Sequence, residues 1–378
     1  AMSDGEAFSA ADYRWMAKAH QQAAEGLIST NPNPRVGCLL VKGERVVGSG
    51  HHIRAGGPHA EIHALNQAGS EAAGATAYVT LEPCSHHGKT PPCCEALIRA
   101  GVKRVVVALQ DPNPAVAGKG IQRLRAAGIE VQSGLLADEC EQMNPGFLSR
   151  MRKNRPYIRI KMAASLDGRT AMASGESQWI TGPQSRNDVQ QLRARSSAIL
   201  TGAGTIVVDN PSLNVRGING VVPPLRVVLD TKGRVPASSR LFTIKTPIVM
   251  VIAEGCEPPE AWLDHPQIRV ISLRPGVGGV DLGQLMEKLA EMEVNDLHVE
   301  AGAPLCGALV REQLMDELVL YTAPVLMGSE ARPLFQLPLA SMSQKMRLQI
   351  VDLRKLGEDI RITARPLWEE NLKMDGCC

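Results

Sequence analysis

The first third of this chain contains the stretches PHAEIHA, residues 58–64, and LEPCSHHGKTPPCC, residues 81–94. They provide one imidazole and two thiols, at His59, Cys84 and Cys93. Such a set is typical of a catalytic zinc site, in which three protein ligands leave the fourth position to water. Because zinc lowers the pKa of its bound water from ~16 to about 7, the set predicts a hydrolytic nucleophile near neutral pH.

Glu61 supplies the second part of that chemistry. Removal of an amino group from an amidine-like ring carbon needs a proton shuttle that lies beside the metal without binding it. In mid-helix His59 and Glu61 would point apart, but in the first, irregular turn both can face one pocket. The order His-x-Glu, Pro-Cys and Cys is the signature of zinc nucleobase deaminases, although eight residues separate the cysteines here instead of two. The first third therefore predicts a zinc-dependent deaminase of an amino-substituted heterocycle.

Three other interpretations of these residues stay open. One of the adjacent cysteines, at 93 and 94, could be a plain core cysteine. His59 and His63 have the i, i+4 spacing of a metalloprotease pair, but that motif needs glutamate directly after the first histidine, where this chain has alanine. A structural zinc site would need a fourth protein ligand, and two histidines are available in the loop between the cysteines.

The segments around these stretches alternate between helices and strands. Apolar residues at helical spacing predict helices at 13–27, 59–68, 93–100 and 120–127. Two β-rich runs, 36–41 and 45–50, flank a short glycine turn and predict a hairpin, and further strands are expected at 78–81, 104–109 and 129–132. This alternation predicts a layered α/β domain.

The pattern restarts after the basic segment 150–156, which predicts a deaminase domain at 1–150 and a second domain at 151–378. Strands are expected at 157–161, 198–201, 225–229, 248–252 and 297–300, and helices at 184–195, 282–292 and 304–313. The second domain is therefore also predicted to be α/β. Because the chain has no Gly-x-Gly-x-x-Gly stretch, a Rossmann domain is not expected.

Composition and charge restrict the partners and the compartment. A formal net charge of +2 gives no long-range field for polyanions, and an aromatic share of 3% is too low for a base-stacking surface, so nucleic acid is not an expected partner. No apolar run is long enough to span a bilayer, and residues 1–12 resemble neither a signal nor a transit peptide. Nine scattered cysteines are unlike a disulfide framework, so we expect a cytoplasmic protein without a membrane partner.

Six stretches carry a resemblance that covers nearly the whole chain. They are NPNPRVG at 31–37, HAE at 59–61, LEPCSHHGKTPPC at 81–93, KMAASLDGRT at 161–170, SQWIT at 177–181 and VEAGAPL at 299–305. Together they closely resemble the bacterial bifunctional riboflavin-biosynthesis deaminase/reductase family, of which the long loop between the cysteines is itself a mark. The resemblance implies a cytidine-deaminase-like three-layer α/β/α first domain and a dihydrofolate-reductase-like α/β second domain.

The resemblance also implies a two-step activity. The first step is zinc-dependent hydrolytic deamination of 2,5-diamino-6-(5-phosphoribosylamino)pyrimidin-4-one. The second is NADPH reduction of the ribosyl group of 5-amino-6-(5-phosphoribosylamino)uracil to a ribityl group. Both substrates are small phosphoribosylated pyrimidines, and a homo-oligomer associated through the second domain is the family expectation. The rival hypothesis is a nucleoside or nucleic-acid deaminase whose second domain only binds a nucleotide.

Matching motif positions imply the roles of individual residues. Zinc falls to His59, Cys84 and Cys93, and proton transfer falls to Glu61. Contacts with the deaminase substrate fall to Asn33, His52 and Lys89. Contacts with NADPH fall to Ala163, Trp179, Thr205, Asp209 and Gly302. Contacts with the reductase substrate fall to Lys161, Ser177, Arg193, Leu213, Arg216 and Glu300, of which the two arginines suit phosphate recognition by forked donors. The proton donor of the reduction stays open between Asp167, Glu300 and water.

Overall fold

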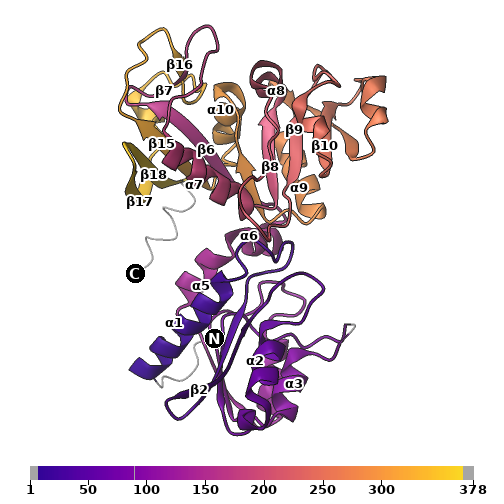
Figure 1. Cartoon of the computed structure of the whole chain (residues 1–378), viewed down its shortest axis with the longest axis vertical. Helices are drawn as coiled ribbons and strands as arrows, with labels where there is room; N and C mark the ends of the chain where they lie inside the picture. The colour runs from indigo at the N-terminus through magenta and orange to yellow at the C-terminus, as the bar shows by residue number, and fades with distance from the viewer. Residues whose placement is uncertain (1–6, 89, 369–378) are drawn as a thin grey trace. The chain divides into compact units, whose positions relative to one another are not determined.

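The computed structural model describes residues 7–88 and 90–368. The chain divides into two compact units, Ala1–Lys153 and Asn154–Cys378 (Figure 1). Residues 150–153, part of the basic segment expected between the domains, are the last turn of helix α6 (Pro145–Lys153). Basic side chains stabilise that position because they face the negative end of the helix dipole. The division therefore falls three residues beyond the boundary expected from the sequence.

The first unit is built on a five-stranded sheet with the strand order β2-β1-β3-β4-β5. Its strands are β1 (Gly37–Lys42), β2 (Arg45–His51), β3 (Thr76–Val79), β4 (Arg104–Val107) and β5 (Glu130–Ser133). β1 is antiparallel to β2 and β3, and the pairs β3–β4 and β4–β5 are parallel. The hairpin and the three later strands expected from the sequence are all present, within about three residues of the predicted ends.

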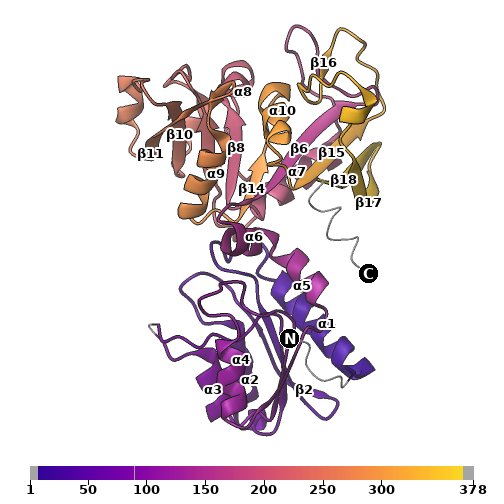
Figure 2. The same cartoon turned by 180° about the vertical axis from the view of Figure 1, so that it is seen from behind.

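Helices cover both faces of this sheet. Cys38 and Leu40 of β1 pack with α2 (Ala60–Ala68), α3 (Cys93–Arg99) and α4 (Lys119–Ala126). The alternate side chains, Leu39 and Val41, pack with α1 (Ala10–Ala24), α5 (Ala137–Met143) and α6. This is the period-two alternation of a strand buried on both sides. The expected three-layer α/β/α arrangement is thereby confirmed (Figures 1 and 2).

The second unit is built on a nine-stranded sheet with the order β11-β10-β9-β8-β14-β6-β15-β18-β17. Its strands are β6 (Tyr157–Ser165), β8 (Ala198–Gly202), β9 (Leu225–Leu229), β10 (Ile248–Ala253), β11 (Ile268–Leu273), β14 (Asp296–Val299), β15 (Glu317–Ala323), β17 (Leu348–Leu356) and β18 (Asp359–Pro366). All neighbours from β11 to β15 pair in parallel, whereas β18 and β17 are added in antiparallel. Two small two-stranded sheets pair β7 (Arg169–Ala171) with β16 (Arg332–Pro333) and β12 (Pro275–Gly276) with β13 (Gly279–Val280).

The large sheet also has helices on both faces. Ile158 and Ile160 of β6 pack with α9 (Leu282–Glu291) and α10 (Ala303–Arg311). On the opposite face, Ile199 of β8 packs with α8 (Ala203–Asp209), and Val319 of β15 packs with α7 (Pro183–Ala194). The α/β class expected for the second domain is confirmed, while α5, α6, α8, β11, β15, β17 and β18 were not anticipated.

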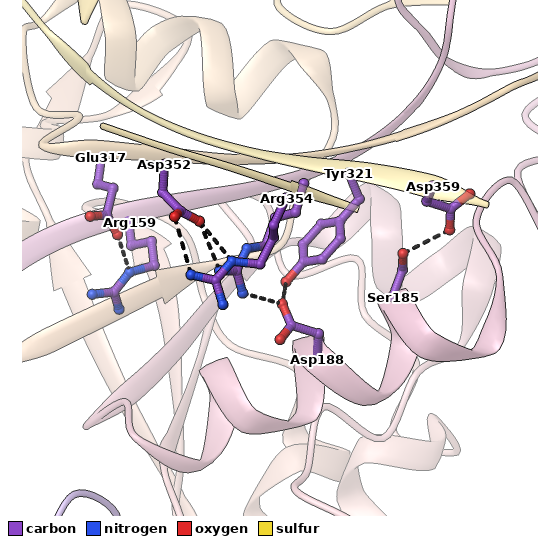
Figure 3. A network of polar contacts seen from close by, with 9 residues as sticks. Arg159, Ser185, Asp188, Glu317, Tyr321, Asp352, Arg354 and Asp359 are labelled. Carbon is purple, nitrogen blue, oxygen red and sulfur yellow. Dashed lines mark hydrogen bonds and ion pairs between the residues drawn. The ribbon is translucent and has the colours of Figure 1, made fainter. Parts of the chain in front are cut away.

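A polar network ties the antiparallel addition to α7 (Figure 3). The Asp188 carboxylate accepts hydrogen bonds from the Tyr321 hydroxyl at 2.6 Å and from Arg361 at 2.8 Å, and the Ser185 hydroxyl donates to Asp359 at 2.7 Å. Through these contacts α7 is joined to both β15 and β18. Over residues 7–88 and 90–368, none of the helices combines the length and the apolarity that a membrane crossing requires.

Candidate active sites

The three predicted zinc ligands converge in the first unit. His59 is the N-cap of α2, Cys84 follows β3, and Cys93 is the first residue of α3. The Nδ1 atom of His59 lies 3.3 Å from the Cys93 sulfur and 3.7 Å from the Cys84 sulfur. A nitrogen and a sulfur bound to one tetrahedral zinc ion are about 3.6 Å apart, so the residues fit the ion.

The ligand cluster contains three residues in the described part of the chain. The histidines at 63, 86 and 87 do not belong to it, and Cys94 packs in the hydrophobic core between the sheet and its helices. A set of three leaves one coordination position open, which is the arrangement of a catalytic rather than a structural zinc site. Both the metalloprotease pair and the four-ligand interpretation are thus disfavoured.

Glu61 lies beside the cluster, in the first turn of α2. His59 has extended backbone angles (φ −73°, ψ 165°), so it is outside the helical geometry that would turn it away from Glu61. The Glu61 side chain is buried, and this burial raises the pKa of its carboxyl. Within the closely spaced pair of thiols, the hydrogen bond with Cys93 lowers the pKa of Cys84, which favours its thiolate, and the same contact raises the pKa of Cys93.

Two of the three expected substrate residues of this unit contact each other. The side-chain amide of Asn33 donates to Nε2 of His52 at 3.1 Å, while Nδ1 of His52 lies 3.0 Å from the carbonyl oxygen of Pro58. Because a carbonyl only accepts, Nδ1 must carry the proton, and the imidazole is the neutral Nδ1–H tautomer. The His52 and His59 rings meet edge to face with centroids 5.5 Å apart, so this pair adjoins the metal cluster. Lys89 lies outside the described residues.

In the second unit, Lys161 and Ala163 lie in the part of β6 that extends beyond the end of the neighbouring strand β14. β14 ends at Val299, opposite Ile160, while β6 continues to Ser165 and pairs on its other side with β15. Gly302 is the N-cap of α10, just after β14, and Thr205 and Asp209 lie on α8, just after β8. Since β6, β8 and β14 are adjacent and parallel, these expected cofactor residues share one edge of the sheet, where α/β folds bind ligands.

Arg193 and Glu300 form a buried pair at the same edge. Nε and Nη2 of Arg193 donate to the two carboxylate oxygens at 2.8 and 2.7 Å. Although burial alone would raise the pKa of Glu300, the nearby charges of Arg193 and Lys161 hold it well below its usual range. Nη1 of Arg193 also donates to the carbonyl of Asn214 at 3.0 Å, which joins the pair to the loop that carries Leu213 and Arg216.

The remaining expected residues lie in the segment before α7. Trp179 is 70% exposed, and the guanidinium of Arg186 lies 4.5 Å above its ring. Ser177 precedes it by two residues and is half-buried. The Trp179 ring thus contacts a cation and remains largely exposed to solvent.

Known sequences and structures match both units. Residues 9–109 match the family "Cytidine and deoxycytidylate deaminase zinc-binding region", and residues 156–362 match the family "RibD C-terminal domain". The riboflavin biosynthesis protein RibD of Escherichia coli (strain K12) is 49% identical over 362 residues, which covers 92% of this chain and 98% of that protein. The corresponding protein of Haemophilus influenzae is 46% identical over 374 residues and covers 95% of this chain. The chain belongs to the RibD family.

Solved structures agree over the same length. Acinetobacter baumannii RibD, form 1, is 45% identical, covers 95% of this chain and 99% of its own, and superposes with a TM-score of 0.89. A Thermotoga maritima structure described as a diaminohydroxyphosphoribosylaminopyrimidine deaminase/5-amino-6-(5-phosphoribosylamino)uracil reductase is 32% identical, covers 94% of this chain and 99% of its own, and has a TM-score of 0.84.

Membership in the RibD family confirms the bifunctional prediction. This chain is a deaminase and reductase of riboflavin biosynthesis, with a zinc-binding deaminase domain and an NADPH-dependent reductase domain. It acts on a small molecule. The rival hypothesis, a binding-only second domain, is excluded by the RibD match over residues 156–362.

Asp167, one of the two acids considered for the reduction, is held by several hydrogen bonds. Asp167 accepts hydrogen bonds from the Ser165 hydroxyl and from the backbone amides of Met327 and Gly328, the latter at 2.9 Å. The Ser165 contact and these amides lower the pKa of Asp167 to about 2. The hydrogen bonds thus favour the ionised form of Asp167, as the charges of Arg193 and Lys161 favour that of Glu300.

Sequence reasoning missed several residues that hold these sites together. Glu82 accepts four backbone N–H groups from the segment 111–121, next to Cys84. The Nε2 atom of buried His298 lies 2.8 Å from Glu300. Arg226 is fully buried beneath the loop that carries Leu213. Glu82 and Arg226 contact segments at least 14 residues away, and His298 contacts Glu300 two residues along the chain. For Arg226 and His298 the only signal is an ionisable residue within a largely buried strand.

Proposed function

We propose that the deaminase unit hydrolyses the amino group of 2,5-diamino-6-(5-phosphoribosylamino)pyrimidin-4-one. The observation that carries this proposal is the three-residue cluster of His59, Cys84 and Cys93 with Glu61 beside it. The name of the Thermotoga maritima relative supports the choice of substrate, and the shared length supports transfer of that choice to this chain. Asn33 and His52, adjoining the cluster, are the proposed contacts with the pyrimidine, together with Lys89 for the phosphate.

The proposed roles follow from the balance of the reaction. One water is consumed, the ring carbon gains a carbonyl oxygen, and ammonia leaves. Zinc held by the three ligands would activate the water at its open position. Glu61 accepts a proton from this water and passes it to the departing amine, a transfer that its burial and raised pKa favour. His52, as the neutral Nδ1–H tautomer, keeps the Asn33 amide oriented toward the ring.

For the second step, we propose reduction of the ribosyl group of 5-amino-6-(5-phosphoribosylamino)uracil to ribityl. NADPH supplies the hydride when bound, and we assign its contacts to Ala163, Trp179, Thr205, Asp209 and Gly302. The end of β6 supports this assignment. Beyond Ile160 this strand has no partner on the β14 side in the described sheet, so its backbone groups there are available to the carboxamide of nicotinamide. The sugar phosphate side is assigned to Lys161, Ser177, Arg193, Leu213, Arg216 and Glu300.

Within that set, the charged residues have different proposed roles. Arg216 is exposed at the loop and can pair with the substrate phosphate, whereas Arg193 is occupied by Glu300 and orients it. The ionised Glu300 carboxylate can only accept hydrogen bonds, so it suits sugar hydroxyl groups. Arg193, expected to bind phosphate, is therefore reassigned to positioning Glu300.

The test is a sequential assay on the purified protein. The diaminopyrimidine ribotide is added first and ammonia release is followed; NADPH is then added and loss of the reduced nicotinamide absorbance is recorded. Both signals are expected. Ammonia without NADPH oxidation would refute the substrate assignment of the second unit, and the absence of both signals from zinc-loaded protein would refute the proposed substrate altogether.

We also propose a homo-oligomeric, cytoplasmic protein that does not bind nucleic acid. The edge strand β17 and its neighbour β18 expose Leu348, Ile350, Val351, Leu353 and Ile360 by between 40% and 63%. An exposed apolar edge strand is commonly covered by a second chain, which supports self-association. Seven free cysteines in the described residues support a reducing compartment, and the net charge of +2 argues against a polyanion partner.

A further inference from the structure

Arg226 is a buried cation whose contacts are all carbonyl groups. It lies in β9, and its side chain is fully buried. Nη1 donates to the carbonyls of Ser212 at 3.0 Å and Leu241 at 2.5 Å, and Nη2 donates to those of Ile244 at 2.6 Å and Thr246 at 2.8 Å. Among the ion pairs of the described residues, none involves Arg226. Burying a charge without a counter-ion is costly, so its presence in a strand calls for a specific use of the forked donor.

One of the two segments that Arg226 holds is the loop at 210–217. This loop has positive φ angles at Asn210 (45°), Leu213 (55°) and Gly217 (76°). The left-handed region is unfavourable for a leucine backbone, so the loop needs outside contacts to keep its conformation. The Arg226 bond to Ser212 acts directly before the least favourable residue.

The other side of the loop is held by α7. Arg193 donates to the carbonyl of Asn214 at 3.0 Å, and the backbone amide of Arg216 donates to the side chain of Gln190 at 2.9 Å. Arg193 in turn holds Glu300 with two hydrogen bonds. The loop is thus fixed between β9 and α7, and the α7 contacts connect it to the carboxylate assigned to the substrate.

We infer that Arg226 is a positioning residue of the reductase unit. It fixes the backbone of the 210–217 loop and so sets where Arg216 and the backbone of Leu213, whose side chain is buried in the core, meet the substrate. This inference rests on the proposed function, because the substrate roles of Leu213 and Arg216 belong to it. Arg226 itself touches neither substrate nor cofactor, since its side chain is fully buried and its Nη1 and Nη2 groups donate to backbone carbonyls of the protein.

The test compares two Arg→Lys variants of buried arginines in one sheet. Arg226→Lys keeps the charge and removes the fork, so at most part of the four-carbonyl contact survives. Arg159→Lys is the matched control: Arg159 is 2% exposed in β6, and its carboxylate partner is Glu317, away from the loop. Both variants are expected to lower the thermal unfolding temperature of the reductase unit.

Only Arg226→Lys is expected to raise the KM for the deaminated pyrimidine ribotide, by about ten- to a hundredfold, the effect of losing a hydrogen bond to a charged group. The KM for NADPH and the rate of ammonia release should stay within about twofold of the wild type. Hydrogen exchange should also accelerate at the amides of 212–217 in Arg226→Lys and not in Arg159→Lys.

Two results would overturn the inference. One is an unchanged substrate KM in a folded Arg226→Lys protein, and the other is an equal rise of that KM in Arg159→Lys. Arg216→Ala separates this failure from a failure of the proposed function. If Arg216→Ala raises the substrate KM and Arg226→Lys does not, the positioning role alone is wrong; if Arg216→Ala has no effect, the substrate assignment of the loop is wrong.

Discussion

Glu61, which is buried, and Glu300, which is largely buried, show how the environment of one residue type sets different chemistry in the two units. Burial dominates at Glu61 and raises the pKa of its carboxyl. At Glu300 the charges of Arg193 and Lys161 outweigh burial and lower the pKa. A carboxyl with a raised pKa takes up a proton more readily and so suits a proton shuttle, whereas one with a lowered pKa favours the ionised form that accepts hydrogen bonds from hydroxyl groups.

Replacement of Glu61 by glutamine therefore tests the shuttle without disturbing the metal ligands. Glutamine has nearly the same shape, but it cannot carry the proton. We expect Glu61→Gln to keep its zinc and to lose deamination by at least about a hundredfold, the usual contribution of a general acid–base group. Ammonia release and metal analysis of the purified variant measure the two effects.

NADPH oxidation with the deaminated substrate is the internal control, because all residues assigned to the reduction lie in the second unit and Glu61 lies in the first. It should be unchanged in Glu61→Gln. Deamination at a rate close to that of the wild type would show that another group moves the proton. Cys84→Ser, which removes a metal ligand, provides the comparison variant that should lose zinc as well as activity.

At this scale the sequence predicted what lies in short motifs and missed what depends on distant partners. His59, Glu61, Cys84 and Cys93 were identified because helix starts and a strand end place them close together. Arg226 was not, since its four acceptors lie in segments whose positions follow only from the folded sheet. The pairing of Arg193 with Glu300, 107 residues apart, likewise needed the structure.

Among the elements, the start of α4 is fixed by a single carboxylate. Glu82, between β3 and Cys84, accepts the backbone amides of Asp111 and Gly118 on Oε1 and those of Gly120 and Ile121 on Oε2, all within 3.1 Å. A Cβ atom at Gly120 would lie 2.0 Å from the carbonyl oxygen of Pro83, so only glycine allows this approach. The zinc-ligand segment and α4 are thereby held together.

Glu82→Gln should consequently destabilise the deaminase unit by about 2–3 kcal/mol, because one oxygen acceptor and the charge that strengthens all four hydrogen bonds are lost. The calorimetric unfolding transition of that unit measures the change. Glu95→Gln is the matched control: its partner Arg123 is 43% exposed, so the loss should stay below about 1 kcal/mol. Equal transitions for Glu82→Gln and the wild type would contradict the anchoring role.

Helix α1 is attached to the sheet by Asp12. Its carboxylate accepts hydrogen bonds from the Tyr78 hydroxyl at 2.7 Å and from Arg104 at 2.9 and 3.1 Å, and it closes the capping box with Ser9. Burial alone would raise the pKa of Asp12, but the hydrogen bonds from Arg104 and Tyr78 lower it well below its usual range. The ionised form is therefore the one that the fold stabilises.

The lowered pKa of Asp12 determines how the stability of the folded state depends on pH. Because the pKa of Asp12 is lower in the folded than in the unfolded state, its contribution is complete above about pH 5 and is lost as the pH falls below about 4. Asp12→Asn should cost about 3 kcal/mol at pH 7, and the difference from the wild type should shrink toward pH 3. Urea unfolding at several pH values checks this; a difference independent of pH would contradict it. Exposed Glu71→Gln is the control and should show no such trend.

At the scale of the whole molecule, the α/β class and most strands of both sheets were predictable, but the C-terminal part of the second sheet was not. Parallel strands such as β10 are buried on both faces, so continuous apolar runs reveal them. β17 is an edge strand with charged residues between its apolar ones, and a bulge between Ile350 and Asp352 breaks its alternation. The sequence of β17 therefore shows neither a continuous apolar run nor a regular alternation of apolar and polar residues.

The same edge strand leads to a prediction about assembly. β17 pairs only with β18 in the described sheet, and its two most exposed apolar side chains are Ile350 at 61% and Leu353 at 63%. Such an edge offers both unpaired backbone groups and apolar surface to a second copy. Light scattering coupled to size-exclusion chromatography should therefore give at least twice the mass of one chain.

Introduction of lysine at both positions should dissociate that assembly, because like charges from two copies would then meet at the edge and the apolar contact would be lost. We expect the Ile350→Lys, Leu353→Lys protein to elute with the mass of one chain and to keep ammonia release within about twofold of the wild type, since the zinc cluster lies in the other unit. Leu263→Lys is the matched control: Leu263 is 71% exposed, in a short helix at 260–264 far from β17 in the sheet order, and its replacement should leave the mass unchanged. A wild-type protein that stays monomeric at high concentration, or a double variant that still associates, would place any interface elsewhere.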